Sequence, residues 1–237
     1  MNRLGPVREA LQAALGRSVA APVTDFAPQL ALAPSAAPLR RAVFIDKDGT
    51  LVVDVPYNVD PARVEFTPHA VEALRLLDRA GYALFVVTNQ PGLAAGRFSR
   101  SEFARLQRAL IDRIQNEAGV ALAGFYTCPH APAPRAALAC LCRKPAPGML
   151  RQAARAHRID LARSWMIGDI LDDVEAGRRA GCRSVLLDVG NETVWRRSPL
   201  REPDHRALDL FEAAQHIVAT AAAEPATDPV RGAGGLQ

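Results

Sequence analysis

Two aspartates set two positions apart, Asp46 and Asp48, are the first side chains whose types and spacing indicate chemistry. They follow an apolar run, residues 43–45, and precede Gly49. Carboxylates this close raise each other's proton affinity unless a cation or a reaction uses them. Because Asp-Gly is a common turn signal, a charged turn is the structural alternative. The pair alone leaves both interpretations open.

Further polar residues lie beside other short apolar runs. They are Thr88 with Asn89, Arg143 with Lys144, and Asp169 with Asp173. Each set alone is explained by an ordinary loop. Together they offer three carboxylates for a hard divalent cation, a hydroxyl and an ammonium for a phosphoryl group, and a carboxylate nucleophile. If the fold brings them together, they predict a site for phosphoryl chemistry.

A second set of residues has the spacing of a metal site. Cys128 and His130 are followed, after nine residues, by Cys140 and Cys142. Three thiolates and an imidazole form a closed tetrahedral set for structural Zn²⁺. Buried or free thiols are the alternative, and a disulfide between Cys140 and Cys142 would be strained. We expect zinc to order this loop and to fix the lysine that follows it, whereas Cys182 is expected to be a core thiol.

The elements that must position these residues alternate along the chain. Apolar runs predict strands over 41–45, 82–88, 124–128, 164–169 and 184–188, and helical patterns cover 68–81, 99–119, 147–157, 172–181 and 208–222. Ser99 with Glu102 forms a capping-box pattern at the start of the second helix. This alternation predicts a parallel sheet with helices on both faces. Working groups collect at the carboxyl ends of such strands, so the polar sets should converge on one edge.

Composition favours one soluble domain. The chain has 237 residues, 49% of them hydrophobic, with a net charge of +4 and only 5% aromatic residues. Arginines spread along the chain with few aromatic rings do not predict a nucleic-acid surface. No apolar run reaches the roughly 20 residues that cross a bilayer. Clustered cysteines favour a reducing cytoplasm.

The sequence pattern predicts three parts in the chain. Residues 1–38 are predicted to be an extension, with a short helix followed by an Ala/Pro-rich linker. Residues 39–222 are predicted to form the folded domain, and residues 223–237 a disordered tail. What the extension does is left open.

Residues 46–50, Asp-Lys-Asp-Gly-Thr, match the first motif of a known family. Over residues 41–190 the chain resembles the haloacid dehalogenase-like (HAD) phosphohydrolases, whose other motifs appear in order as Thr88, Lys144 and the run 168–173. The resemblance implies a Rossmann-like parallel sheet flanked by helices, carrying a short zinc-binding loop and no large cap domain.

The resemblance also implies roles for the first set of residues. Asp46 would attack the substrate phosphorus and form an aspartyl-phosphate, and Asp48 would act first as the acid and then as the base. Thr88 and Lys144 would hold the transferring oxygens. Mg²⁺ would bind Asp46, the backbone carbonyl of Asp48, and Asp169. The implied activity is phosphatase.

Within the family, the zinc loop and residues 142–145 resemble the branch that contains D-glycero-D-manno-heptose 1,7-bisphosphate 7-phosphatases and histidinol-phosphate phosphatases. That resemblance, in which the heptose enzymes are the closer, implies hydrolysis of a small sugar phosphate, with D-glycero-D-manno-heptose 1,7-bisphosphate cleaved at the 7-position as the leading expectation. We also expect a monomer with no nucleic-acid or membrane partner. Contacts to the sugar or its remote phosphate would come from Asp54, Tyr57, Asn89, Gln90 and Arg143. Pro91 and Ile170 depart from the heptose pattern, so histidinol phosphate and other sugar phosphates stay open as substrates. A catalytically silent scaffold is the alternative from another class.

Overall fold

The structure is a computed structural model that describes residues 38–132 and 140–223. The predicted N-terminal extension, the middle of the predicted zinc loop and the predicted C-terminal tail lie outside these residues. The predicted domain boundaries therefore stay predictions. No helix in the described part is long and apolar enough to cross a membrane.

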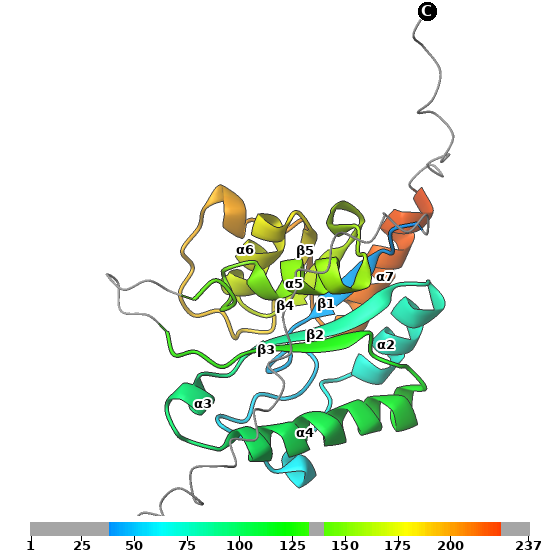
Figure 1. Ribbon diagram of the computed structural model, residues 1–237. Helices are drawn as coiled ribbons and strands as arrows, with labels where there is room; N and C mark the ends of the chain where they lie inside the picture. Colours follow the sequence, from blue (N-terminus) through cyan, green and yellow to red (C-terminus); the bar gives the residue numbers. More distant parts are fainter. Residues whose placement is uncertain (1–37, 133–139, 224–237) are drawn as a thin grey trace, which may run out of the picture. The chain divides into compact units, whose positions relative to one another are not determined.

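A six-stranded parallel sheet forms the centre of the described part (Figure 1). Its strands follow the order β3-β2-β1-β4-β5-β6. Their bounds are β1 (Ala42–Ile45), β2 (Ala83–Asn89), β3 (Gly124–Cys128), β4 (Trp165–Gly168), β5 (Arg183–Leu187) and β6 (His205–Ala207). Ile45 of β1 pairs with Val86 of β2 on one side and with Ile167 of β4 on the other. The predicted parallel sheet is confirmed.

Helices cover both faces of this sheet. In Figure 1, α2 and α4 lie on one side of the strands, and α5 and α6 lie on the other. The helices are α2 (Ala70–Arg79), α3 (Pro91–Ala94), α4 (Arg100–Arg113), α5 (Gly148–His157), α6 (Leu171–Ala180) and α7 (Leu210–Ala223). Shorter elements are the 3-10 helices η1 (Pro61–Arg63), η3 (Leu161–Arg163) and η4 (Pro199–Arg201), and the π-helical turn η2 (Ile114–Ala118).

The strands are apolar on both faces because each face has its own core. In β1, Val43 and Ile45 pack with residues of α2, α4 and α7. The alternate residues, Ala42 and Phe44, pack with residues of α5 on the opposite face. All four side chains are fully buried. Continuous apolar strands of this kind are typical of a parallel sheet covered on both sides.

The predicted capping box at the start of α4 is confirmed. The Ser99 hydroxyl accepts from the backbone N–H of Glu102 at 3.2 Å, and a Glu102 carboxylate oxygen accepts from the backbone N–H of Ser99 at 2.7 Å. The two bonds satisfy donors that a helix start otherwise leaves without partners. Downstream, the predicted helix continues beyond α4 as the π-helical turn η2.

The strand order fixes where a ligand is expected. β2 and β4 lie on opposite sides of β1, so the direction of strand addition reverses beside β1. Ligands of open parallel sheets bind at the carboxyl ends of the strands at such a point. Asp46 follows β1 directly and Asp169 follows β4 directly.

Candidate functional site

A buried lysine lies between two buried carboxylates at this edge. Lys144 Nζ pairs with a carboxylate oxygen of Asp46 and lies 2.7 Å from Asp173 Oδ1. It also donates to the backbone carbonyl of Val87 at 3.0 Å. The lysine precedes α5, whereas its partners follow β1 and begin α6. Four separate segments of the chain therefore meet at one ammonium group.

The proton affinities of this cluster reflect burial and charge. Burial is the largest effect on Asp46 and raises its pKa well above the usual value, opposed by Lys144 and reinforced by the charges of Asp173, Asp169 and Asp48. Burial likewise raises the pKa of Asp173. Burial alone would lower the pKa of Lys144, but the two carboxylates outweigh it and the net pKa is above the usual value. The cluster carries more acidic than basic groups, which favours a bound cation.

Asp169 is held by a donor at each carboxylate oxygen. Thr50 Oγ1 donates to Oδ1 at 3.0 Å, and Asn191 Nδ2 donates to Oδ2 at 2.8 Å. Gly49 has a φ of +81°, and a Cβ atom there would lie 2.2 Å from Asp169 Oδ2. Glycine is therefore required at this position both for its backbone conformation and for the close approach of the aspartate.

The carboxylates fit a hard divalent cation. Ligand atoms of Asp46, Asp169 and Asp173 lie within 4.8 Å of one another, and all three residues are buried. Oxygen-only sets of this kind suit Mg²⁺. The side chain of Asp48 is not part of this cluster.

Asp48 is held by two neighbours. Gln90 Nε2 donates to Asp48 Oδ2 at 2.9 Å and to Thr88 Oγ1 at 3.0 Å. The ammonium of Lys47, a buried residue that the sequence did not single out, pairs with Asp48 Oδ1. Gln90 was predicted to contact the substrate; in the structure its amide joins Asp48 to Thr88.

All residues predicted for the catalytic, substrate-binding and Mg²⁺ sites line one cavity of about 470 Å³. Asn89 uses its amide within the protein, since its oxygen accepts from the backbone N–H of Lys144 at 3.0 Å and its nitrogen donates to the carbonyl of Lys144 at 3.1 Å. It therefore fixes the segment that contains Lys144 to the end of β2.

Two other residues predicted to contact the substrate differ in their surroundings. Tyr57 is exposed. Burial raises the pKa of Asp54, and the negative charge of Asp48 raises it further.

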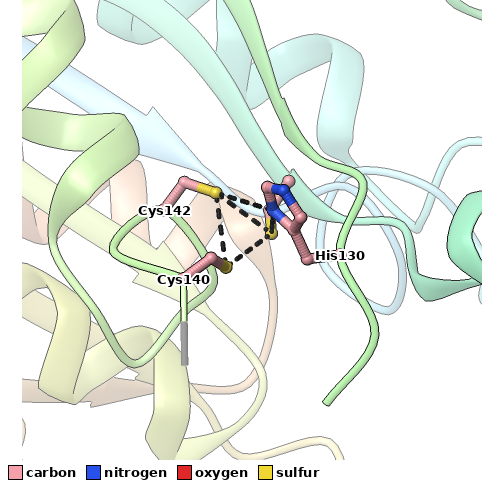
Figure 2. A group of neighbouring side chains, drawn as sticks. His130, Cys140 and Cys142 are labelled. Carbon is pink, nitrogen blue, oxygen red and sulfur yellow. Dashed lines mark hydrogen bonds between the residues drawn. The ribbon is translucent and has the colours of Figure 1, made fainter. Parts of the chain in front are cut away.

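The predicted zinc ligands converge. Cys128 ends β3, and Figure 2 shows the side chains of His130, Cys140 and Cys142 turned toward one another. Cys142 Sγ lies 3.3 Å from Cys128 Sγ, 3.4 Å from Cys140 Sγ and 3.2 Å from His130 Nδ1. Tetrahedral Zn²⁺ with sulfur ligands at about 2.3 Å places its ligands about 3.7 Å apart. The distances between the ligand atoms in the structure are slightly shorter than this value, and the four ligand atoms converge. The residues therefore fit a structural zinc ion.

The zinc-ligand set is tied to the cavity through Arg143. The backbone N–H of Arg143 donates to Cys140 Sγ at 3.4 Å, and its guanidinium donates to the backbone carbonyl of His130 at 3.3 Å. The side chain of Arg143 also lines the cavity. The arrangement of the zinc-ligand set therefore affects where Arg143 and the following Lys144 lie.

Three residues that hold the aspartates of the site were not among the predicted site residues. Thr50 and Asn191 hold Asp169, and Lys47 holds Asp48. Thr50 and Lys47 lie within the first motif, so their positions offered a signal. Asn191 belongs to a loop after β5 that carries no recognisable pattern, and only the folded chain brings it to the cavity.

Comparisons with known proteins show what this chain is similar to. A family model described as HAD-hydrolase-like matches residues 141–213. D-glycero-beta-D-manno-heptose-1,7-bisphosphate 7-phosphatase from Haemophilus ducreyi is 39% identical over 150 residues, which cover 62% of this chain and 82% of the relative. The protein of the same name from Photorhabdus laumondii is 42% identical over 178 residues, which cover 72% of this chain and 88% of the relative.

A solved structure is similar in fold as well. The D,D-heptose 1,7-bisphosphate phosphatase from B. bronchiseptica, complexed with magnesium and phosphate, superimposes with a TM-score of 0.66 at 29% sequence identity. The superposition covers 77% of this chain and 99% of that chain.

Proposed function

The chain belongs to the HAD-like hydrolase family, and we propose that it is a Mg²⁺-dependent phosphatase that removes the 7-phosphate of D-glycero-D-manno-heptose 1,7-bisphosphate. One observation carries the proposal. Asp46, Asp48, Lys144 and Asp169 line a single cavity at the point where the sheet reverses its order. A carboxylate nucleophile, an acid, an ammonium and a metal ligand are the groups that hydrolysis through a phosphorylated enzyme needs.

The first step forms the aspartyl-phosphate. A carboxylate oxygen of Asp46 attacks the phosphorus, and the bond to the sugar oxygen breaks with its electron pair. Asp48 gives its proton to that oxygen, so a neutral alcohol leaves. Lys144 and Thr88 bind the transferring oxygens. The hydrogen bond from Gln90 keeps the carboxyl group of Asp48 at the cavity wall beside Thr88.

The second step returns the enzyme to its starting state. Water attacks the phosphorus of the aspartyl-phosphate, Asp48 accepts the proton of that water, and inorganic phosphate leaves, so that Asp46 is again a carboxylate and Asp48 again a carboxylic acid. Asp46, Asp169 and the backbone carbonyl of Asp48 would hold Mg²⁺, whose positive charge would offset the repulsion between the nucleophile and the phosphoryl oxygens. Burial raises the pKa of Asp46, and the positive charge of Lys144 opposes that rise.

Arg143 is proposed to bind the remote phosphate of the bisphosphate substrate. Its side chain lines the cavity and is held at one end by the carbonyl of His130. A planar guanidinium binds a phosphate through two parallel hydrogen bonds, which a lysine does not reproduce. The names of the relatives support heptose bisphosphate over histidinol phosphate.

Steady-state kinetics on the full-length protein test the proposal. Phosphate release is measured from heptose 1,7-bisphosphate, histidinol phosphate and a panel of sugar monophosphates, with Mg²⁺ and Zn²⁺ present. We expect the highest kcat/KM on the bisphosphate, release of one phosphate per molecule, and no turnover by Asp46→Asn. Faster hydrolysis of histidinol phosphate would overturn the substrate assignment, and no turnover of any ester would overturn the phosphatase assignment.

We further propose that Cys128, His130, Cys140 and Cys142 bind one structural Zn²⁺ per chain. The convergence of four suitable ligand atoms supports this. Metal analysis of purified protein is expected to find about one zinc per chain, and far less in Cys142→Ser. Because the loop leads into Arg143, the same variant should raise KM for the bisphosphate. A zinc-free preparation with unchanged kinetics would contradict the proposal.

A further inference from the structure

The loop after β5 contacts the metal-binding edge through Asn191. Its Nδ2 atom donates to Asp169 Oδ2 at 2.8 Å, while Thr50 Oγ1 donates to the other oxygen of the same carboxylate at 3.0 Å. A carboxylate held at both oxygens has one favoured orientation, and each oxygen keeps a lone pair for a cation. Asn191 itself lines the cavity and is exposed there.

The next residue, Glu192, fixes the start of α6. Its Oε2 atom accepts from the backbone N–H of Leu171 at 2.8 Å. Ile170 occupies the N-cap position of this helix, and an isoleucine side chain has no atom that can accept a hydrogen bond. The first N–H groups of a helix need such acceptors, and a carboxylate near a helix N-terminus is also favourable electrostatically. A residue distant in sequence thus supplies an acceptor that the side chain of Ile170 cannot provide.

This arrangement depends on the glycine of the first motif. A Cβ atom at Gly49 would lie 2.7 Å from Asn191 Nδ2 as well as 2.2 Å from Asp169 Oδ2. The first motif, the end of β4 and the loop after β5 therefore touch at a single place. Glycine at position 49 is therefore what allows the amide of Asn191 to lie this close to the first motif.

The other end of the same loop is fixed to α6. Arg201, in η4, donates to Glu175 Oε2 and to Asp172 Oδ1, each at 2.6 Å. Both acceptors belong to α6, whose N-terminus is bound by Glu192. The loop is thus attached to one helix at two points, which holds Asn191 in place although it is exposed to the cavity.

We propose that Asn191 is a positioning residue for the carboxylate of Asp169, and that Glu192 supports it by fixing the start of α6. The inference rests on the proposed function, because it assigns Asp169 to the metal site of that reaction. Without the amide of Asn191, the carboxylate of Asp169 loses one of its two donors and rotates more freely. Outer partners of metal ligands typically contribute about 10-fold to 100-fold in affinity.

A magnesium titration without substrate tests the proposal. The melting temperature of the full-length protein is followed against Mg²⁺ concentration, because a ligand that binds only the folded state raises it. We expect Asn191→Ala to need about 10-fold more Mg²⁺ for the half-maximal rise. Thr193→Ala, in the same loop, is the matched control and should titrate like the wild type. Asn191→Gln, which keeps an amide donor, should recover part of the affinity.

Glu192 is tested by a pair of variants. Glu192→Ala removes the acceptor for Leu171 and should weaken Mg²⁺ binding, whereas Glu192→Gln keeps a carbonyl oxygen and should restore much of it. Should Asn191→Ala not fold, Asn191→Ser replaces it, since a serine hydroxyl is too short to reach Asp169.

Kinetics separate this role from direct substrate binding. If Asn191→Ala raises KM for the bisphosphate but leaves the magnesium titration unchanged, the residue contacts the substrate and the proposal is overturned. Unchanged titration and unchanged kinetics overturn it as well. If the wild type hydrolyses no phosphate ester while the titrations still differ as expected, the proposed function fails and the positioning role stands.

Discussion

At the scale of single residues, Lys144 is the charge whose loss should cost the most. It is buried and pairs with Asp46 and Asp173, which are also buried. Replacing it in Lys144→Met leaves two buried carboxylates without their cation. We expect the free energy of unfolding at pH 7 to fall by about 3–5 kcal/mol, measured by urea denaturation, together with loss of activity.

The pH dependence of this variant gives a second readout. Burial raises the pKa of Asp46 and of Asp173, and Lys144 is the charge that opposes this in the native protein. Acids with a raised pKa in the folded state bind more protons there than in the unfolded chain, so they reduce stability as pH rises above about 4. The deficit of Lys144→Met should therefore be smaller at pH 5 than at pH 7. Adding Asp173→Asn to Lys144→Met should recover part of the lost stability. A Lys144→Met protein as stable as the wild type would contradict this account.

Cys182 offers a test that is independent of the active site. It was predicted to be a core thiol, and the structure confirms that it is buried. Burial, with a smaller contribution from the charge of Asp160, raises its pKa to about 12. The thiolate is the reactive form of cysteine. At pH 8, iodoacetamide should therefore leave Cys182 unmodified in the native protein and modify it in the denatured protein. Peptide mass spectrometry measures the modification, and rapid labelling in the native state would argue against a buried thiol.

The residues that sequence could predict at the site are those inside recognisable motifs. The aspartates, the lysine and the cysteines stand out by type and spacing, and the structure brings them into one cavity and one cluster. Asn191 could not be found in this way because neither its type nor its neighbours indicate chemistry. Its importance arises only from the contact of its amide with Asp169.

At the scale of elements, the capping box of α4 makes a measurable contribution. Ser99→Ala removes the acceptor for the backbone N–H of Glu102 and should lower the free energy of unfolding by about 1 kcal/mol. Ser99→Thr keeps a hydroxyl and serves as the control, with a smaller loss expected. Urea denaturation measures both variants. Equal losses in the two would show that packing, rather than the hydrogen bond, is responsible.

The elements that sequence could not predict are short ones. Strand β6, His205–Ala207, has three residues and no apolar run to mark it, and α3, Pro91–Ala94, is a single turn after β2. Pairing with β5 and the packing of α7 supply the stability of β6, and neither is visible locally. Longer strands with buried residues on both faces were predicted within a few residues of their observed bounds.

At the scale of the whole molecule, we propose that a chain beginning at residue 39 carries the complete phosphatase. Among the residues that the structure describes, those from 39 onward form the sheet, the core and the cavity. Deleting residues 1–38 should leave the melting temperature and kcat unchanged, measured by calorimetry and phosphate release. A large fall in either would mean that the N-terminal residues contribute to the fold or to the site.

The arrangement of the strands could be predicted only in part. Alternating strands and helices predict a parallel sheet and therefore a common edge for the polar groups. The pattern does not say that β4 joins the sheet beside β1 instead of beside β3. That choice depends on how the helices pack on each face, and it decides that Asp46 and Asp169 become neighbours.

The position of β4 next to β1 also bears on how the protein is made. While the ribosome is still synthesising the segment before Trp165, β1 can pair with β2 on one side only, and its other edge is a row of unsatisfied backbone groups on an apolar strand. Such edges recruit foreign strands. We therefore expect the nascent polypeptide to be prone to aggregation until β4 has been synthesised, and slow elongation before the codon for Trp165 to lengthen its need for chaperones.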